Sequence, residues 1–266
     1  MRNYWLAIVI LGCLGGEARA VLPRVQVVHQ NSPAVVAVNV ARKDGTSFTG
    51  TGFVLTPEGL IATSRHVTEG ARYMNITFSN GRISSEAKII VCTSTVDLCL
   101  LKIAARNLPT VTVASSARVM PGQDITVIGN PRRLQNTVSS GLISQVRQKS
   151  NGVVWHQISA PISPSSSGSP VFDTNGNVIS VAFASYPGAE NQNLNFAVPS
   201  DYLLQLVHKA GYRLPLPRES SASQTAVSSV EKESAASGSF LQAFWRHCQK
   251  SWELLLRIIH RIRTGA

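Results

Sequence analysis

Residues 162–170 read Ile162-Ser163-Pro164-Ser165-Ser166-Ser167-Gly168-Ser169-Pro170, a serine-rich loop directly before the apolar pair Val171-Phe172. A serine hydroxyl is a poor nucleophile until a base takes its proton, and a tight turn is needed to keep it exposed. Gly168 permits such a turn after Ser167, and Pro170 fixes the chain as it enters the next strand. Ser167 is therefore a candidate nucleophile, although most serine-rich loops are only loops.

Two residues earlier in the chain could complete a catalytic group with this serine. His66 follows the apolar run 60–62, where an imidazole can sit at a cleft with a pKa near neutrality, as a general base requires. Asp97 opens the apolar run 98–101, so its carboxylate should be partly buried and in need of a partner such as an imidazole N–H. Each also has an ordinary explanation, as a surface histidine after a strand and as an aspartate that caps a turn.

On both sides of these residues the chain alternates short apolar, β-branched runs with turn signals. Strands are predicted at residues 34–40, 51–55, 60–62, 89–92, 98–103, 125–128, 138–146, 153–158, 171–172 and 178–184. Helical periodicity is predicted only at residues 200–210 within this region. So many strands over this length predict an all-β fold, either a sandwich or a pair of barrels.

The three candidates occur in the order His66, Asp97, Ser167, which is the order of chymotrypsin and not of subtilisins or α/β-hydrolases. With the motifs around them, the chain resembles the protease domain of the HtrA (Deg-type) family of trypsin-like serine endopeptidases, without a PDZ domain. The resemblance covers about residues 31–201. Its motifs, in order, are Ser32-Pro33-Ala34-Val35-Val36, Gly50-Thr51-Gly52-Phe53-Val54-Leu55, Ile61-Ala62-Thr63 with His66-Val67, Asp97-Leu98 with Leu100-Leu101-Lys102-Ile103, Ile128-Gly129-Asn130-Pro131, Thr137-Val138-Ser139-Ser140-Gly141-Leu142-Ile143-Ser144, Ser167-Gly168-Ser169-Pro170 and Leu194-Asn195-Phe196-Ala197-Val198-Pro199.

The resemblance implies a trypsin-like pair of six-stranded β-barrels with the site between them. It assigns Ser167 as nucleophile, His66 as general base and acid, and Asp97 as the group that orients the imidazole. It implies an oxyanion hole from the backbone N–H groups of Ser165 and Ser167. A substrate would lie as an added strand along Val181, Ala182, Phe183 and Ala184. No metal or organic cofactor is implied, and homotrimers are suggested.

Two departures from the family pattern concern the oxyanion loop. The family reads Gly-Asn-Ser-Gly-Gly-Pro where this chain has Ser165-Ser166-Ser167-Gly168-Ser169-Pro170, so two glycines have become serines. A positive φ at Ser165 would cost about 1–2 kcal/mol. We therefore expect either low activity or a loop that becomes competent only with substrate bound.

Cys92 and Cys99 flank Asp97, seven residues apart, across a predicted turn between paired strands. In an oxidising compartment they could form a disulfide that braces the Asp97 loop. Two buried free thiols are the alternative, because spacing does not reveal geometry.

The first twenty residues have the pattern of an export signal. A positive start is followed by an apolar run and by Ala18-Arg19-Ala20, a small-x-small cleavage site. A competing cut exists at Cys13, because Ile10-Leu11-Gly12-Cys13 resembles the bacterial lipobox, in which the cysteine carries lipid. Either way, the protein is expected to work outside the cytoplasm, in the periplasm or secreted.

After residues 21–212, the predicted protease domain, the composition changes. Residues 213–239 are rich in Ser and Ala and are interpreted as a linker. Residues 240–263 place Trp245, Trp252, Leu255 and Ile259 on one helical stripe, with arginines off the stripe. This basic amphipathic helix could lie on an anionic membrane, pair with copies of itself, or dock on the protease core.

The composition indicates a folded protein and bears on its possible partners. Hydrophobic residues make up 44% and charged residues 15%, so a sizeable core can form. The net charge of +11 is spread along the chain without a nucleic-acid-binding motif, so a nucleic-acid partner is not expected.

The sequence predicts an exported serine endopeptidase that cleaves polypeptides, chiefly unfolded or misfolded ones. The alternative is a weak or inactive protease-like module that binds peptides and is tethered by its terminal helix.

Overall fold

The computed structural model describes residues 22–84, 86–130, 136–163, 165–185, 194–214 and 217. These residues belong to one compact unit, Arg19–Pro217. The predicted signal peptide with Cys13, most of the predicted linker and the predicted terminal helix lie outside the described residues. Within the described part of the chain, no helix combines the length and the apolar character that crossing a membrane requires.

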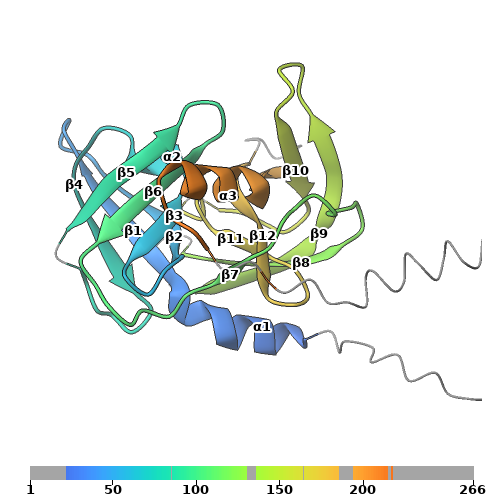
Figure 1. Ribbon diagram of the computed structural model, residues 1–266, viewed down its shortest axis with the longest axis horizontal. Helices are drawn as coiled ribbons and strands as arrows, with labels where there is room; N and C mark the ends of the chain where they lie inside the picture. Colours follow the sequence, from blue (N-terminus) through green and yellow to red (C-terminus); the bar gives the residue numbers. More distant parts are fainter. Residues whose placement is uncertain are drawn as a thin grey trace, which may run out of the picture. The chain divides into compact units, whose positions relative to one another are not determined.

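The first half of the domain is a six-stranded antiparallel sheet with the order β4-β1-β2-β3-β6-β5 (Figure 1). Its inward side chains are mostly Val, Ile and Leu, which suit a pleated, buried surface. The strands are β1 (Val35–Arg42), β2 (Ser47–Val54), β3 (Leu60–Thr63), β4 (Ala71–Phe78), β5 (Ala87–Thr93) and β6 (Leu98–Ile103).

The second half is a seven-stranded sheet with the order β11-β8-β9-β10-β13-β12-β7, closed on itself by pairing of β11 with β12. Six strands were expected; the seventh is β7, whose two residues pair in parallel with the start of β12. The strands are β7 (Thr112–Val113), β8 (Asp124–Gly129), β9 (Thr137–Gln148), β10 (Val154–Ile158), β11 (Pro170–Phe172), β12 (Asn177–Ser185) and β13 (Asn195–Pro199). The trypsin-like all-β prediction is confirmed.

Short helices complete the domain. They are α1 (Arg24–Asn31), the 3-10 turn η1 (Ser32–Ala34), the single turn α2 (Arg65–Thr68) and α3 (Ser200–Lys209). The amphipathic α3 buries Leu203, Leu206 and Val207 and packs on strands of both sheets. The sequence predicted α3 but not α1.

One hydrophobic core joins the two sheets. Phe172, Val181 and Val198 of the second sheet belong to the same buried cluster as Phe53 and Leu60 of the first. A smaller cluster, which includes Ile125 and Ile143, lies within the second sheet alone. Because dense apolar packing leaves little room for one sheet to move against the other, loops that meet at their junction are held in fixed positions.

A buried polar pair interrupts the apolar interior of the second sheet. His156 is 2% exposed, and its Nδ1 lies 2.6 Å from Ser180 Oγ. The Ser180 hydroxyl donates to the carbonyl of Ile179 at 2.7 Å, so Nδ1–H is the donor to Ser180. Burial lowers the pKa of His156 to about 4, although the charge of Asp201 opposes this shift. The imidazole is therefore neutral in the folded protein at neutral pH.

We expect His156 to make the domain less stable in mild acid. Its pKa in the folded state lies below the ordinary value of 6.5, so folding favours the neutral form. This contribution is complete above pH 6.5 and is lost as the pH falls toward 4. From about pH 7.5 to about pH 5, the free energy of unfolding should fall by about 2 kcal/mol from this group alone.

Urea unfolding at the two pH values measures this loss. His156→Gln should remove most of the pH dependence, whereas His208→Gln, at an exposed position of α3, should leave it unchanged. Equal pH slopes for the wild type and His156→Gln would show that His156 is not the titrating group.

Candidate active site

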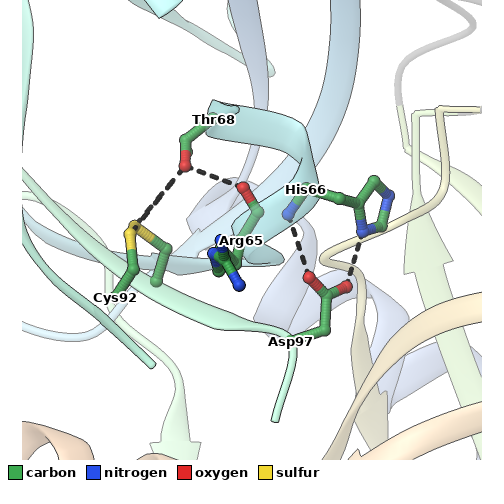
Figure 2. The surroundings of a disulfide bond; sticks show 6 residues. Arg65, His66, Thr68, Cys92 and Asp97 are labelled. Carbon is green, nitrogen blue, oxygen red and sulfur yellow. Dashed lines mark hydrogen bonds and ion pairs between the residues drawn. A yellow bond between two sulfur atoms is a disulfide. The ribbon is translucent and has the colours of Figure 1, made fainter. Parts of the chain in front are cut away.

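His66 and Asp97 meet at the end of the first sheet. His66 lies in α2, directly after β3, and Asp97 ends the turn between β5 and β6. The carboxylate contacts His66 twice: Oδ2 lies 2.5 Å from the imidazole Nδ1, and Oδ1 accepts the backbone N–H of His66 at 2.9 Å (Figure 2). The backbone N–H of Arg65 also donates to the carbonyl of Asp97, at 3.3 Å. These contacts fix the plane of the imidazole and leave Nε2 as its other functional atom.

The electrostatics keep Asp97 ionised. Burial alone would raise the pKa of this carboxyl group, but hydrogen bonds and the charge of His66 outweigh burial and lower the pKa below its usual 3.8. Ser64 contributes a further hydrogen bond in the same direction. A carboxylate that stays charged beside Nδ1 can stabilise a positively charged imidazole.

Ser167 lies on a tight turn against the segment that leads into His66. Gly168, with φ +89°, approaches so closely that an added Cβ would collide with Thr51 O and lie 2.6 Å from Thr63 Oγ1 and 3.0 Å from Ser64 N. Only glycine permits both this conformation and this approach. The turn is held on one side by Thr51 N–H, which donates to Ser167 O at 2.9 Å, and on the other by Gly168 N–H, which donates to Ala182 O at 2.7 Å.

The Ser167 hydroxyl donates to the carbonyl of Phe183 at 3.3 Å in this structure. A hydroxyl rotates easily to suit its acceptors, and hydrogen bonds between catalytic groups often tighten only when substrate binds. The turn therefore presents Ser167 beside β12, with its Oγ in a weak, exchangeable contact.

Before Ser167, the chain forms a turn with an unusual residue. Ser166 N–H donates to Ser163 O at 2.9 Å, and Ser165, the third residue of this turn, has φ +75°. A positive φ at that position is typical of type II turns and normally calls for glycine. The strain that the sequence predicted for Ser165 is therefore present, at about 1–2 kcal/mol.

The backbone donors of the same turn fall into two groups. The N–H groups of Ser166, Gly168 and Ser169 each donate to a carbonyl. Those of Ser165 and Ser167 have no acceptor among the described residues. Because backbone N–H groups near a buried site rarely lack a partner, these two are candidates for binding an anionic oxygen.

We expect Ser165→Gly to strengthen the binding of an anionic oxygen by the N–H groups of residues 165 and 167. Glycine adopts a positive φ without strain, so the turn should be populated more fully. Turnover of a peptide should rise by up to about tenfold, since 1.4 kcal/mol corresponds to a factor of ten. Ser166 is not among the described residues with a positive φ, so Ser166→Gly serves as the control and should bring no gain. A slower Ser165→Gly chain would mean that the serine is required.

Thr51 was not singled out from the sequence, although it organises this turn. Fully buried in β2, it donates from Oγ1 to Ser165 O at 2.8 Å and accepts the Asn130 N–H at 3.0 Å. The only signal in the sequence is its place between Gly50 and Gly52, where an added Cβ would collide with Val67 and with the carbonyl of Ala62, so that β2 is closely packed on both sides of Thr51.

Part of the predicted substrate segment is already paired within the sheet. Val181 pairs with Pro170 of β11, and both backbone groups of Ala182 bond to Gly168 and Ser169, so these two residues belong to the closed sheet. Beyond Ala182, β12 pairs only with β13 among the described strands. The edge that could accept another strand therefore begins at Phe183 and continues through Ala184.

Cys92 and Cys99 are joined by a disulfide in the structure (Figure 2). They are directly paired residues of β5 and β6, and the turn that ends at Asp97 lies between them. No three His, Cys, Asp or Glu side chains in the described part of the chain gather as metal ligands.

The sequence and the fold of this chain are similar to those of known proteins. Residues 50–181 match the family of trypsin-like peptidase domains. A putative serine protease HhoB of Synechocystis sp. is 37% identical over 158 residues, which cover 57% of this chain and 37% of that protein. A probable periplasmic serine endoprotease DegP-like of Halomonas elongata is 32% identical over 161 residues, 59% of this chain and 34% of that protein.

Solved structures agree with these relatives. The HtrA-type protease AlgW with a tripeptide has a TM-score of 0.65 at 28% identity and matches 70% of this chain and 63% of its own. A serine endoprotease from Yersinia pestis has a TM-score of 0.63 at 29% identity and matches 71% and 66%. The chain thus spans little more than a third of the two curated relatives. By its fold, its motifs and these relatives, the chain contains a trypsin-like peptidase domain that is similar to those of HtrA-type serine proteases.

Proposed function

We propose that the protein is a serine endopeptidase in which Ser167, His66 and Asp97 form the catalytic triad. The observation that carries this proposal is the doubly hydrogen-bonded His66–Asp97 pair beside a turn that presents Ser167 and two N–H groups without an acceptor among the described residues. Each part of an acyl-transfer site is thereby supplied by a named group.

In the proposed reaction, Ser167 Oγ attacks the scissile carbonyl as His66 Nε2 takes its proton. The Asp97 carboxylate stabilises the imidazolium that forms. The N–H groups of Ser165 and Ser167 stabilise the oxyanion. His66 then gives its proton to the leaving amine, and water activated by the same imidazole hydrolyses the acyl-enzyme.

The substrates that suit this site are extended polypeptides. A chain that adds to the edge of β12 beyond Ala182 must offer its own backbone groups, and in a folded protein most of these groups are already hydrogen-bonded. We therefore infer a preference for unfolded or misfolded proteins. The signal-like residues 1–20 and the periplasmic endoprotease among the relatives support work in the periplasm or outside the cell.

The terminal segment, residues 240–263, could add a membrane surface or self-association to these partners. Liposome co-sedimentation over a salt series tests the membrane: no binding to anionic vesicles at low salt would exclude it.

A fluorescently labelled, unfolded protein and a fluorophosphonate probe test the proposed function together. Covalent labelling accompanied by release of short fluorescent peptides supports the endopeptidase. A folded chain that neither labels nor cleaves but still binds the unfolded protein would instead favour the non-catalytic peptide-binding alternative.

A further inference from the structure

We propose that the Cys92–Cys99 disulfide is a thiol-reducible site that sets the alignment of the His66–Asp97 pair, and so the rate of the reaction. This inference rests on the proposed function. It assigns to the domain a second reaction, thiol–disulfide exchange, with small thiols or dithiols as its reactants.

The disulfide lies at the base of the turn that carries Asp97. It joins two residues that face each other across β5 and β6, and these strands lead into and out of the turn that ends at Asp97. The backbone of the turn has few hydrogen bonds: Thr95 N–H donates to Thr93 Oγ1 at 3.2 Å, Leu98 N–H donates to Val96 O at 2.8 Å, and Arg65 N–H of α2 donates to Asp97 O at a longer 3.3 Å. The covalent link is therefore the firmest constraint on the backbone that carries the Asp97 carboxylate.

Thr68 connects the disulfide to the other half of the pair. Thr68 Oγ1 donates to the carbonyl of Arg65 at 2.8 Å, across the helical turn that carries His66 (Figure 2). The same oxygen lies 3.6 Å from Cys99 Sγ and 3.9 Å from Cys92 Sγ. Since a hydroxyl has one proton, a thiolate formed at Cys99 would compete with Arg65 O for it, because charged acceptors bind a proton donor more strongly than neutral ones.

Access to the sulfurs is unequal. Cys99 is 0% exposed, whereas Cys92 is half-buried and lines a groove of about 390 Å³ between the β5–β6 turn and α3. Tyr202, Gln205 and Lys209 of α3 form the opposite wall. A thiolate is negatively charged, so the Lys209 ammonium favours its entry. The geometry points to Cys92 Sγ as the atom attacked and to Cys99 as the leaving group.

Reduction of the disulfide consumes two external thiols. The first thiolate forms a bond to Cys92 Sγ as the bond between Cys92 and Cys99 breaks, and the electron pair leaves on Cys99 as a thiolate. A second thiolate attacks the sulfur of the first, which releases a small disulfide and leaves Cys92 as a thiolate. Both cysteine thiolates then take protons from water. The two external thiols are oxidised and the protein disulfide is reduced.

The test uses the full chain with Cys13→Ser and Cys248→Ser, so that Cys92 and Cys99 are the only cysteines. We expect a small dithiol to expose two groups to a maleimide that shifts the band on a gel. In parallel, kcat for a peptide should fall by about tenfold to a hundredfold, the range expected when a catalytic group is displaced by up to about 1 Å. KM should change little, and reoxidation should restore kcat.

Two variants distinguish a loss of alignment of the His66–Asp97 pair from a general loss of folding. Cys92→Ala/Cys99→Ala should be folded, as judged by its thermal transition, should have the kcat of the reduced protein, and should not respond to the dithiol. Thr68→Val keeps the disulfide but loses the link to Arg65. It should lower kcat in the oxidised state and reduce the further fall on reduction, with KM unchanged.

Two labelled thiols without a change in kcat would overturn the proposal, as would a native chain whose disulfide resists the dithiol. An oxidised chain that shows neither probe labelling nor turnover contradicts the proposed function instead. The two failures are therefore distinguishable, because the maleimide shift does not depend on peptide cleavage.

Discussion

Ser167→Ala is expected to abolish labelling by a fluorophosphonate and to lower kcat for a peptide by about a millionfold, as loss of the nucleophile does in other serine proteases. The alanine keeps the turn intact, because the contacts that shape it use the backbone of Ser167 and the missing Cβ of Gly168. Binding of an unfolded polypeptide should therefore survive, and kcat, not KM, should carry the loss.

Ser166→Ala is the matched control, since it removes a neighbouring hydroxyl from the same turn. It should keep labelling and most of the turnover. Labelling that persists in Ser167→Ala but disappears in Ser166→Ala would move the nucleophile by one residue. Turnover that survives in both would point to a reaction that does not pass through an acyl-enzyme on this turn.

Hydrophobic patterning and family motifs predicted the strands whose sequences are clear apolar runs. Strands such as β6 and β8 are short apolar runs bounded by turn signals, and the structure places them within a residue or two of the prediction. β4 was missed although Met74, Ile76 and Phe78 are buried and alternate with the partly exposed Asn75 and Thr77; this alternation is short and follows the exposed Arg72 and Tyr73. The helix α1 was missed because its hydrophobic face is weak and only Val27 and Asn31 are buried.

For the site as well, the sequence predicted which residue types matter but not how they are arranged in space. The residue types and their order in the chain predicted His66, Asp97 and Ser167 as the catalytic group, because an imidazole, a carboxylate and an alcohol in this order are chemically informative. The extent of the free β12 edge could not be foreseen, since it depends on which backbone groups β11 uses. Thr51 was overlooked for a similar reason: its hydroxyl bonds to Ser165 and to Asn130, which are both far from it in sequence.

Ser165 illustrates what a departure from a family pattern can predict. A serine in place of glycine raised the question of a positive φ, and the structure has φ +75° there. The identity of the residue could not say whether the backbone would keep the conformation or relax. Here the hydrogen bond from Thr51 to the Ser165 carbonyl offsets part of the strain.

Asp97→Asn is expected to lower kcat by about ten-thousandfold while leaving the fold intact. Asp97 Oδ1 accepts the backbone N–H of His66, so the amide oxygen of an asparagine must take that position. The NH2 group then faces His66 Nδ1, where Oδ2 lies in the wild type. As a donor, it forces the imidazole proton onto Nε2, the atom that has to accept the proton of Ser167.

Asp44→Asn is the control, because Asp44 lies in the exposed hairpin between β1 and β2 and bonds only to Thr46 among its described contacts. Its kcat should equal that of the wild type, and so should the thermal transitions of both variants. A kcat within about tenfold of the wild type for Asp97→Asn would show that Asp97 does not set the tautomer. Since the disulfide acts through the same carboxylate, Asp97→Asn should also lose most of the response to a dithiol, whereas Asp44→Asn should keep it.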